Sequence, residues 1–280
     1  MPLDSIAEIL ASCSERNLAF WQVVLEADVE KRQVSAEASF EKMRATWRAM
    51  LDSAESYDGG LRSVSGLSGG DGELMRRYAA GGSALGGGYI SEVIATALCV
   101  GESNACMRKI VAAPTAGACG VLPAVLVPLY RRGEREEDIL RALYTAAGIG
   151  AVINSRASIS GAAGGCQAEI GSASAMAAGA LAQLRGGGPE QTANALAMAL
   201  KNLMGLICDP VAGLVEVPCV KRNVIGAVNA VSCADMALAG ITSRIPADEV
   251  IDCMGIVGER LPREFRETAR GGLAATPTGR

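Results

Sequence analysis

The feature of this sequence that most constrains its fold is a series of apolar stretches with helical spacing, separated by short segments of glycine, proline, asparagine and serine. No stretch alternates apolar and polar residues as a half-buried strand does, and no Asn-Gly or Asp-Gly pair joins two β-branched runs. The pattern therefore predicts an all-α fold. Beyond residue 130, the predicted helices span residues 138–147, 173–184, 189–203, 224–239 and 247–258.

Small side chains supply most of the apolar volume. Half of the 280 residues are hydrophobic but only 4% are aromatic, so alanine, glycine, valine, leucine and methionine form the core. Small side chains let helix backbones approach closely, which predicts tight packing in a single compact domain. Within it we expect an N-terminal helical arm with a glycine-rich loop, residues 1–75, and a helical body with cysteine-bearing loops, residues 76–280.

The N-terminal arm has an apolar face. Seven residues recur at steps near those of an α-helix, and charged residues fill the positions between them. This spacing predicts one helix face that packs on the body of the protein, with docking to a partner as the alternative. The seven residues are Leu25, Val29, Ala36, Phe40, Met43, Trp47 and Met50.

Two glycine-rich segments follow the arm, at residues 63–72 and 81–88. Neither contains the lysine of a P-loop or lies between a strand and a helix as a dinucleotide-binding motif does. The sequence therefore gives little support for a nucleotide site. It predicts loops that are flexible or that let two backbones approach closely.

The charge balance and the absence of histidine exclude several classes of function. With 26 basic and 30 acidic residues, the net charge of −4 is not typical of proteins that bind nucleic acid or an anionic membrane. Without histidine, a Ser-His-Asp triad, a Cys-His dyad and a histidine-liganded zinc or iron site cannot form within this chain. A general base is therefore another residue type or belongs to another chain.

The termini and the longest apolar stretch predict a cytoplasmic protein. Residues 1–4 lack the basic-then-apolar pattern of a secretory signal. The charge-free stretch 110–130 is about as long as a bilayer span, but Pro114, Pro123 and Pro128 interrupt it, which favours buried protein interior. Nine cysteines in a chain with no export signal indicate reduced thiols.

Three of the cysteines lie in polar breaks between apolar helices. Cys166, Cys208 and Cys219 each have glycine or proline close by, which predicts turns rather than helix interiors. Cys119 also lies in a glycine-flanked turn, and its role stays open. The other cysteines have the pattern of small apolar residues on buried helix faces, and they are Cys13, Cys99, Cys106, Cys233 and Cys253.

Three thiolates from three loops, in a chain without histidine, favour a soft metal or an iron–sulfur cluster. The spacing alone does not decide between them, because it contains no CxxC pair. Three cysteines on a four-iron cluster would leave one iron open as a Lewis acid for a substrate oxygen. A structural metal, such as zinc in a non-catalytic subunit, is the alternative.

Four blocks of the sequence resemble the α chain, or α domain, of the iron–sulfur-dependent L-serine dehydratases. The first three are residues 110–124, with Pro-Thr-Ala-Gly-Ala-Cys-Gly at their centre, the loop 158–167 and the segment 208–219, which reads Cys-Asp-Pro-Val-Ala-Gly-Leu-Val-Glu-Val-Pro-Cys. The fourth is the closing Gly-Gly-Leu-Ala-Ala-Thr-Pro-Thr-Gly of residues 271–279. Together these blocks extend the resemblance over nearly the whole chain.

This resemblance implies a function and a cofactor. The family converts L-serine to pyruvate and ammonia with a 4Fe–4S cluster and without pyridoxal phosphate, and its cluster cysteines correspond to Cys166, Cys208 and Cys219. Residues 76–280 would then be the cluster-binding catalytic domain. The family also implies a β chain that carries a histidine-containing segment, so this chain is expected to work in a hetero-oligomer. Related lyases that act on L-threonine or L-cysteine are the alternative.

The chain departs from the family at two places. Some single-chain relatives end in a cysteine that reaches the cluster, whereas this chain ends Thr278-Gly279-Arg280. Many relatives carry a histidine in a Glu-His-Asn run before the second cluster loop, where this chain has Lys201 and Asn202. Any role of that histidine therefore cannot be transferred to this chain.

Several polar residues near these blocks are candidates for contact with the substrate. Thr115 lies in a turn that can present N–H groups to an anion, and capping a helix is its alternative role. Lys221 and Arg222 are placed to attract a carboxylate, and a solvated or helix-end role is their alternative. The catalytic candidates are Thr115, Asn154, Ser158 and Ser160, and the substrate-binding candidates are Asn202, Lys221 and Asn223. The sequence does not identify the base; Glu169 is one possibility, with stabilisation of a helix dipole as its alternative role.

Overall fold

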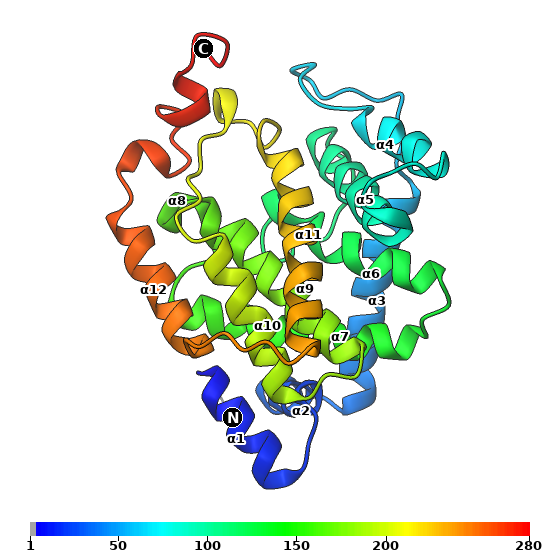
Figure 1. Cartoon of the computed structure of the whole chain (residues 1–280), viewed down its shortest axis with the longest axis vertical. Coiled ribbons are helices and arrows are strands. Elements are labelled where there is room, and N and C mark those ends of the chain that lie inside the picture. The colour runs from blue at the N-terminus through cyan, green and yellow to red at the C-terminus, as the bar shows by residue number, and fades with distance from the viewer. Residues whose placement is uncertain (1–3) are drawn as a thin grey trace.

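The computed structural model describes residues 4–280, and in that range it contains α-helices, shorter helical turns and no β-strand, which confirms the all-α prediction (Figure 1). The helices are α1 Ile6–Arg16, α2 Phe20–Arg32, α3 Ala36–Glu55, α4 Asp71–Ala80, α5 Gly87–Ala105, α6 Val121–Arg131, α7 Glu136–Arg156, α8 Gly161–Gly164, α9 Ser172–Leu184, α10 Pro189–Asn202, α11 Cys219–Leu238 and α12 Ala247–Arg260. The short turns are η1 Ala116–Ala118, η2 Gln167–Gly171, η3 Val211–Gly213, η4 Arg263–Phe265 and η5 Gly272–Ala275.

Helix α9 forms the centre of the packing, against α7, α10 and α11. Its sequence, Ser-Ala-Ser-Ala-Met-Ala-Ala-Gly-Ala-Leu-Ala, is buried at every position from Ser172 to Ala182. Small side chains allow this because neighbouring backbones come close. At Gly179 an added Cβ would lie 2.3 Å from Cδ1 of Ile149 on α7, so the two helices leave no space for a side chain there.

The N-terminal arm differs from the prediction because it is not one helix face. Gln33 adopts a left-handed backbone with φ of 53°, which ends α2, and Ser35 caps a new helix through its side chain. The prediction that all seven apolar residues share one face is therefore wrong. The prediction that the arm packs on the body is confirmed, because Trp47 of α3 is fully buried with its ring 5.5 Å from that of Tyr130.

The charge-free stretch 110–130 lies largely in the core. Residues Val121–Pro128 of α6 are all buried, which confirms the prediction of protein interior. Within residues 4–280, no helix combines the length and apolar character that a membrane crossing needs.

Helix boundaries also moved relative to the predictions. Helix α7 continues to Arg156, well beyond the predicted end at residue 147, and α11 begins at Cys219 rather than at residue 224. Helix α4 runs across residue 75, where we placed the division between arm and body. The early start of α11 matters for the site, because it places Cys219 in the first turn of a long helix.

Candidate functional site

Cys219 begins α11 and Cys208 pairs with Arg266 of the C-terminal segment; these elements lie at the end of the molecule where the chain ends (Figure 1). Three segments meet there: the turn from α8 into η2, the loop between α10 and α11, and the C-terminal segment after α12. Cys166 and Cys208 are each only 3% exposed, and Cys219 is half-buried.

Cys166 is held by a short turn and by the residue after it. Gly165 has φ of 76°, and an added Cβ would lie 2.7 Å from Leu261, so glycine is required there. Gln167 is fully buried; its backbone N–H donates to the Leu206 carbonyl at 2.9 Å, and its side chain accepts from the Gly205 N–H at 2.8 Å. Gln167 therefore fixes the Cys166 turn to the loop that carries Cys208.

Cys208 is held by the C-terminal segment. Its N–H donates to the Phe265 carbonyl at 2.8 Å, and its carbonyl accepts from the Glu267 N–H at 2.9 Å. These two bonds form an isolated parallel bridge between Cys208 and Arg266. The backbone after α12 therefore determines where the Cys208 side chain lies.

Cys219 is the first residue of α11, and its loop is anchored to the glycine-rich segment. The buried carboxylate of Glu216 accepts hydrogen bonds from the hydroxyls of Ser63 and Ser65, at 2.6 and 2.7 Å. A helix N-terminus has unpaired N–H groups and a partial positive charge, both of which favour a thiolate. The glycine-rich segment 63–72 thus contacts the loop that precedes Cys219 through these two serines.

The three thiols share one electrostatic environment. Burial raises the pKa of the Cys166 thiol to about 12 and that of the Cys219 thiol to about 11, and it also raises the pKa of the Cys208 thiol. Cys219 raises the pKa of Cys166, and both of them raise the pKa of Cys208. The guanidinium of Arg222 acts in the opposite direction on Cys166 and Cys219. The thiols are therefore close enough for a charge on one to affect the others.

Glu169, which the sequence offered only as a possible base, is a further side chain at this site. Burial raises the pKa of its carboxyl group, while Thr115 lowers it. The Cys208 sulfur lies 4.0 Å from Glu169 Oε2. Added Cβ atoms at Gly161 and Gly117 would lie 2.5 and 3.3 Å from the carboxylate oxygens, so these glycines make room for it. The sequence offers one indication that Glu169 lies beside Cys166. Glu169 follows Cys166 by three positions, and residues three apart share a helix face.

Arg222 and Asp209 also belong to the site. Arg222 Nη2 lies 2.8 Å from Asp209 Oδ1 in an ion pair that is largely buried, with side-chain exposures of 12% and 2%. Arg222 Nη1 donates to the Ile207 carbonyl at 2.9 Å. Asp209 directly follows one predicted cysteine ligand, and Arg222 follows another, Cys219, by one helical turn.

The donor set fits an iron–sulfur cluster. Three buried sulfur donors in a site without histidine match the cysteine ligands of such clusters. In the range 4–280, no three His, Cys, Asp or Glu side chains converge on a point where they could hold one metal ion. In a four-iron cluster each cysteine binds a different iron, so the sulfurs need not meet at one point. The arrangement is therefore compatible with a cluster.

Two candidate polar residues lie next to the thiols. Thr115 begins η1 and lies close to Glu169, although its buried hydroxyl has no hydrogen bond of normal geometry. Asn223 is 1% exposed; its side chain accepts from the Gly120 N–H at 2.8 Å and donates to the carbonyls of Gly117 and Cys219 at 2.8 and 3.0 Å. Asn223 thus fastens η1 to α11 through backbone contacts.

The side-chain contacts described for the remaining candidates do not connect them to the three thiols. Ser160 is exposed, and its N–H is capped by the Ser158 hydroxyl at 3.1 Å. Asn202 donates to Asn229 at 2.9 Å, and Lys221 pairs with Asp71 at 2.8 Å on an exposed surface. Arg222, rather than Lys221, is the cation that acts on the cysteines. The roles given to these residues stay predictions.

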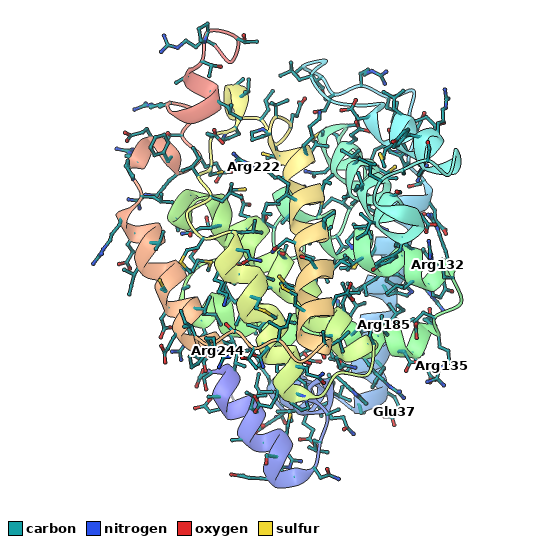
Figure 2. All side chains as sticks on the ribbon, in the orientation of Figure 1. Glu37, Arg132, Arg135, Arg185, Arg222 and Arg244 are labelled. Atoms are coloured by element: carbon teal, nitrogen blue, oxygen red, sulfur yellow. The ribbon has the colours of Figure 1, made fainter. Side chains whose placement is uncertain are left out.

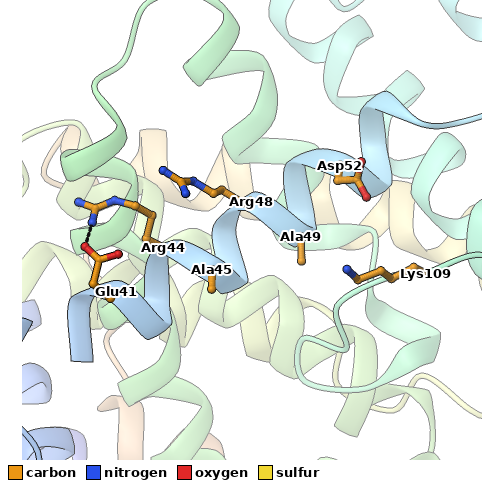
Figure 3. Close-up of a pocket in the computed structure, with 7 residues that line it drawn as sticks. All are labelled: Glu41, Arg44, Ala45, Arg48, Ala49, Asp52 and Lys109. Carbon is orange, nitrogen blue, oxygen red and sulfur yellow. Dashed lines mark hydrogen bonds and ion pairs between the residues drawn. The ribbon is translucent and has the colours of Figure 1, made fainter. Parts of the chain in front are cut away.

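Asn154 lines a separate cavity of about 1050 Å³ between α2, α3 and α7. A smaller hollow of about 370 Å³ lies on α3, where Arg44 pairs with Glu41 at one end and Lys109 lies toward Asp52 at the other (Figure 3). Neither hollow is lined by a cysteine. The chemistry-bearing side chains therefore gather at the thiol site.

The other cysteines are mostly structural, as expected. Cys13, Cys99 and Cys233 are buried, and Cys119 joins them at 1% exposure in the core. Cys106 is half-buried at the end of α5. The prediction is wrong for Cys253, which is exposed on α12.

Comparison with known proteins places the chain in a family. A family model described as "Serine dehydratase alpha chain" matches residues 15–274. A Bacillus subtilis protein named probable L-serine dehydratase, alpha chain, is 47% identical over 277 residues, which cover 99% of this chain and 92% of the relative. The L-serine dehydratase, alpha chain, of Peptoniphilus asaccharolyticus is 41% identical over 283 residues, with 99% and 96% covered. The Escherichia coli L-serine dehydratase 1 is 37% identical over 289 residues, with 98% of this chain and 62% of that longer relative covered.

Proposed function

This chain belongs to the serine dehydratase α-chain family, and we propose that it is the cluster-bearing chain of an L-serine dehydratase, a lyase that forms pyruvate and ammonia from L-serine. The observation that carries the proposal is that hydrogen bonds join the segments of Cys166, Cys208 and Cys219. The Gln167 N–H and the Arg222 side chain donate to the carbonyls of Leu206 and Ile207, just before Cys208, and the thiols influence one another's pKa. These thiols would hold a 4Fe–4S cluster, and pyridoxal phosphate would not be needed. When bound, the cluster supplies an open iron as a Lewis acid for the hydroxyl group that leaves serine.

The surroundings of the thiols suit a small zwitterionic substrate. The carboxylate of Glu169 is the acidic group beside Cys208, and glycines at 117 and 161 leave the space around it free of side chains. We infer that Glu169 contacts the substrate near its ammonium group and Cα. The first turn of α11 and the η1 turn near Thr115 offer N–H groups of the kind that bind carboxylates.

A second chain is expected to complete the enzyme. The relatives from B. subtilis and P. asaccharolyticus are named as α chains, a name that implies a partner chain. The longer E. coli relative extends well beyond the region that matches this chain. We propose that a β chain supplies groups that this chain lacks, histidine among them, in a cytoplasmic hetero-oligomer.

The test is anaerobic co-expression of this chain with its β chain, followed by assays of pyruvate from L-serine. Iron content and visible absorbance of the purified complex report the cluster. Pyruvate formation together with about four irons per α chain, the content of a cubane cluster, would support the proposal. Colourless protein that contains one zinc and forms no pyruvate would contradict it. Parallel assays with L-threonine and L-cysteine decide between the related substrates, since L-cysteine would release sulfide.

A further inference from the structure

Two consecutive cations in the first turn of α11 have opposite surroundings. Lys221 is exposed, and its side chain forms a surface ion pair with Asp71 at 2.8 Å. Arg222 turns inward and forms a largely buried pair with Asp209 (Figure 2). The two pairs carry the same charges on neighbouring residues, so they differ mainly in burial and in what the cation contacts.

The guanidinium of Arg222 is fully committed within this chain. One nitrogen, Nη2, lies 2.8 Å from Asp209 Oδ1, and the other, Nη1, donates to the Ile207 carbonyl at 2.9 Å. Its positive charge also lowers the pKa of the Cys166 thiol, so the group lies near that side chain. A guanidinium has its donors in a rigid planar arrangement, so the two fixed contacts hold the group in one orientation. Asp209 and Ile207 flank Cys208 in the sequence, so Arg222 links the start of α11, where Cys219 lies, to the segment that carries Cys208.

Asp209 is itself held in place. Its Oδ2 accepts a hydrogen bond from the Leu273 N–H at 2.8 Å. The adjacent Gly272 has φ of 59°, and an added Cβ would lie 2.4 Å from that same oxygen. The C-terminal segment therefore closes over Asp209, and the carboxylate has one orientation in which it serves both Leu273 and Arg222.

We propose that Arg222 is a positioning residue for the cluster ligands: bound to Asp209 and to the Ile207 carbonyl, it fixes the segment of Cys208 against the start of α11 and places its positive charge beside the three thiols. This inference rests on the proposed function, since it requires that Cys208 and Cys219 ligate a cluster. Net charge and hydrogen bonds around the ligating sulfurs are among the factors that set the reduction potential of iron–sulfur clusters. Groups that orient a metal ligand also contribute to metal affinity.

The test measures two properties of the loaded complex that do not depend on turnover. One is the midpoint reduction potential of the cluster, and the other is the rate of iron release to a chelator under anaerobic conditions. In Arg222→Gln the potential shifts to a more negative value, and iron release accelerates by about 10-fold or more, the low end of the range for outer-shell partners of metal ligands. Arg222→Lys, which keeps the charge but loses the planar fork, shifts both properties in the same direction by less. Asp209→Asn loosens the guanidinium and so also accelerates iron release by less, but because it removes a negative charge it moves the potential to a more positive value.

The surface pair provides matched controls. Lys221→Gln removes the same unit charge one residue away, and Asp71→Asn removes the same carboxylate charge from the partner. Both leave the potential and the iron-release rate within about twofold of the unmodified complex, because exposed charges are strongly screened by solvent. Circular dichroism of each variant verifies folding; if Arg222→Gln does not fold, the comparison is made with Arg222→Lys and Asp209→Asn.

Two results would overturn the inference while leaving the proposed function intact. One is a cluster in Arg222→Gln whose potential and iron-release rate equal those of Lys221→Gln. If Arg222→Gln does not fold, the same equality in both Arg222→Lys and Asp209→Asn has this meaning. The other is an increased KM for L-serine in Arg222→Gln with both cluster properties unchanged, which would assign the guanidinium to the substrate carboxylate. A wild-type complex that holds no cluster would instead contradict the proposed function itself.

Discussion

Helix α11 carries two cysteines with contrasting surroundings. Cys219 is its first residue and shares its environment with Glu169 and Arg222. Cys233 lies farther along the same helix, fully buried, with its sulfur 3.4 and 3.6 Å from the side-chain amides of Asn202 and Asn229. Burial raises the pKa of both thiols, so burial alone does not distinguish them.

The difference lies in the neighbours. Around Cys219 there are two further thiols, two carboxylates and a guanidinium, whereas neutral amides contact Cys233 and the one charge that acts on it is that of Lys201. A thiol among neutral groups behaves as a small apolar side chain, and a group of thiols with charges nearby has the composition of a ligand set. This comparison teaches that clustering and charge, rather than depth, separate a ligand from a core residue.

The largest expected effect is the loss of a ligand thiol. Cys219→Ala, and likewise Cys166→Ala or Cys208→Ala, should lower both iron retention and pyruvate formation by well over about 100-fold, because even outer-shell partners of metal ligands contribute 10–100-fold. Iron analysis and the pyruvate assay on the anaerobic complex measure both effects. Cys233→Ala on the same helix is the control and should retain its iron. Full iron content in any of the three ligand variants would remove that cysteine from the ligand set.

The second effect concerns Glu169. Glu169→Gln keeps the size of the side chain and removes its negative charge, and we expect kcat/KM for L-serine to fall by about 100-fold, a typical contribution for a side chain that acts on a reacting group. The matched control is Glu102→Gln, since Glu102 is also a buried carboxylate, but it accepts bonds from Tyr57 and from the start of α4. That control should lose stability rather than turnover. If Glu169→Gln retains activity within about threefold, its proposed contact with the substrate is wrong.

A smaller effect is expected where the C-terminal segment meets the site. Gly272→Ala forces alanine into a left-handed backbone and places its Cβ 2.4 Å from Asp209. We expect a loss of about 1–3 kcal/mol in the free energy of unfolding from the backbone strain, together with faster iron release as Asp209 moves. Gly213→Ala is the matched control, because Gly213 also has a positive φ, of 72°, but nothing lies within 4 Å of its Cβ position. Equal iron release in the two variants would show that Gly272 affects stability through its backbone conformation and does not affect the position of Asp209.

The sequence allowed more of the fold to be predicted than of the site. Helical spacing of apolar residues predicted the helices from α9 to α12, because burial on one face follows directly from sequence. It did not reveal the break at Gln33, because that residue adopts a left-handed backbone without being glycine. It also did not predict α6, since Pro123 and Pro128 argued against a continuous helix through residues 110–130, although both are accommodated in this shorter buried helix.

At the site, the three cysteines were identified from their turn-like surroundings, but for their charged neighbours Glu169 and Arg222 the sequence left a role in the site and a role at a helix end open. Glu169 follows Cys166 by one helical turn, and Arg222 has the same relation to Cys219. That spacing was available in the sequence, yet it does not say which side of a helix faces the site. Lys221 and Arg222 are consecutive cations, and only the start of α11 at Cys219 decides that Arg222 points inward.

The smallest expected effect concerns Cys233, the core cysteine that was compared with Cys219. Cys233→Ala removes one buried sulfur, and the lost contacts and the small cavity should lower the free energy of unfolding by about 1–2 kcal/mol. Cys253 is exposed on α12, so Cys253→Ala should change that free energy by less than about 0.5 kcal/mol. Denaturant titration of the complex measures both changes, and iron analysis should find the full iron content in both. Loss of iron in Cys233→Ala, without a matching loss of stability, would mean that the Cys233 thiol affects how the three ligand cysteines hold iron. The distinction between ligand and core cysteines would then be wrong.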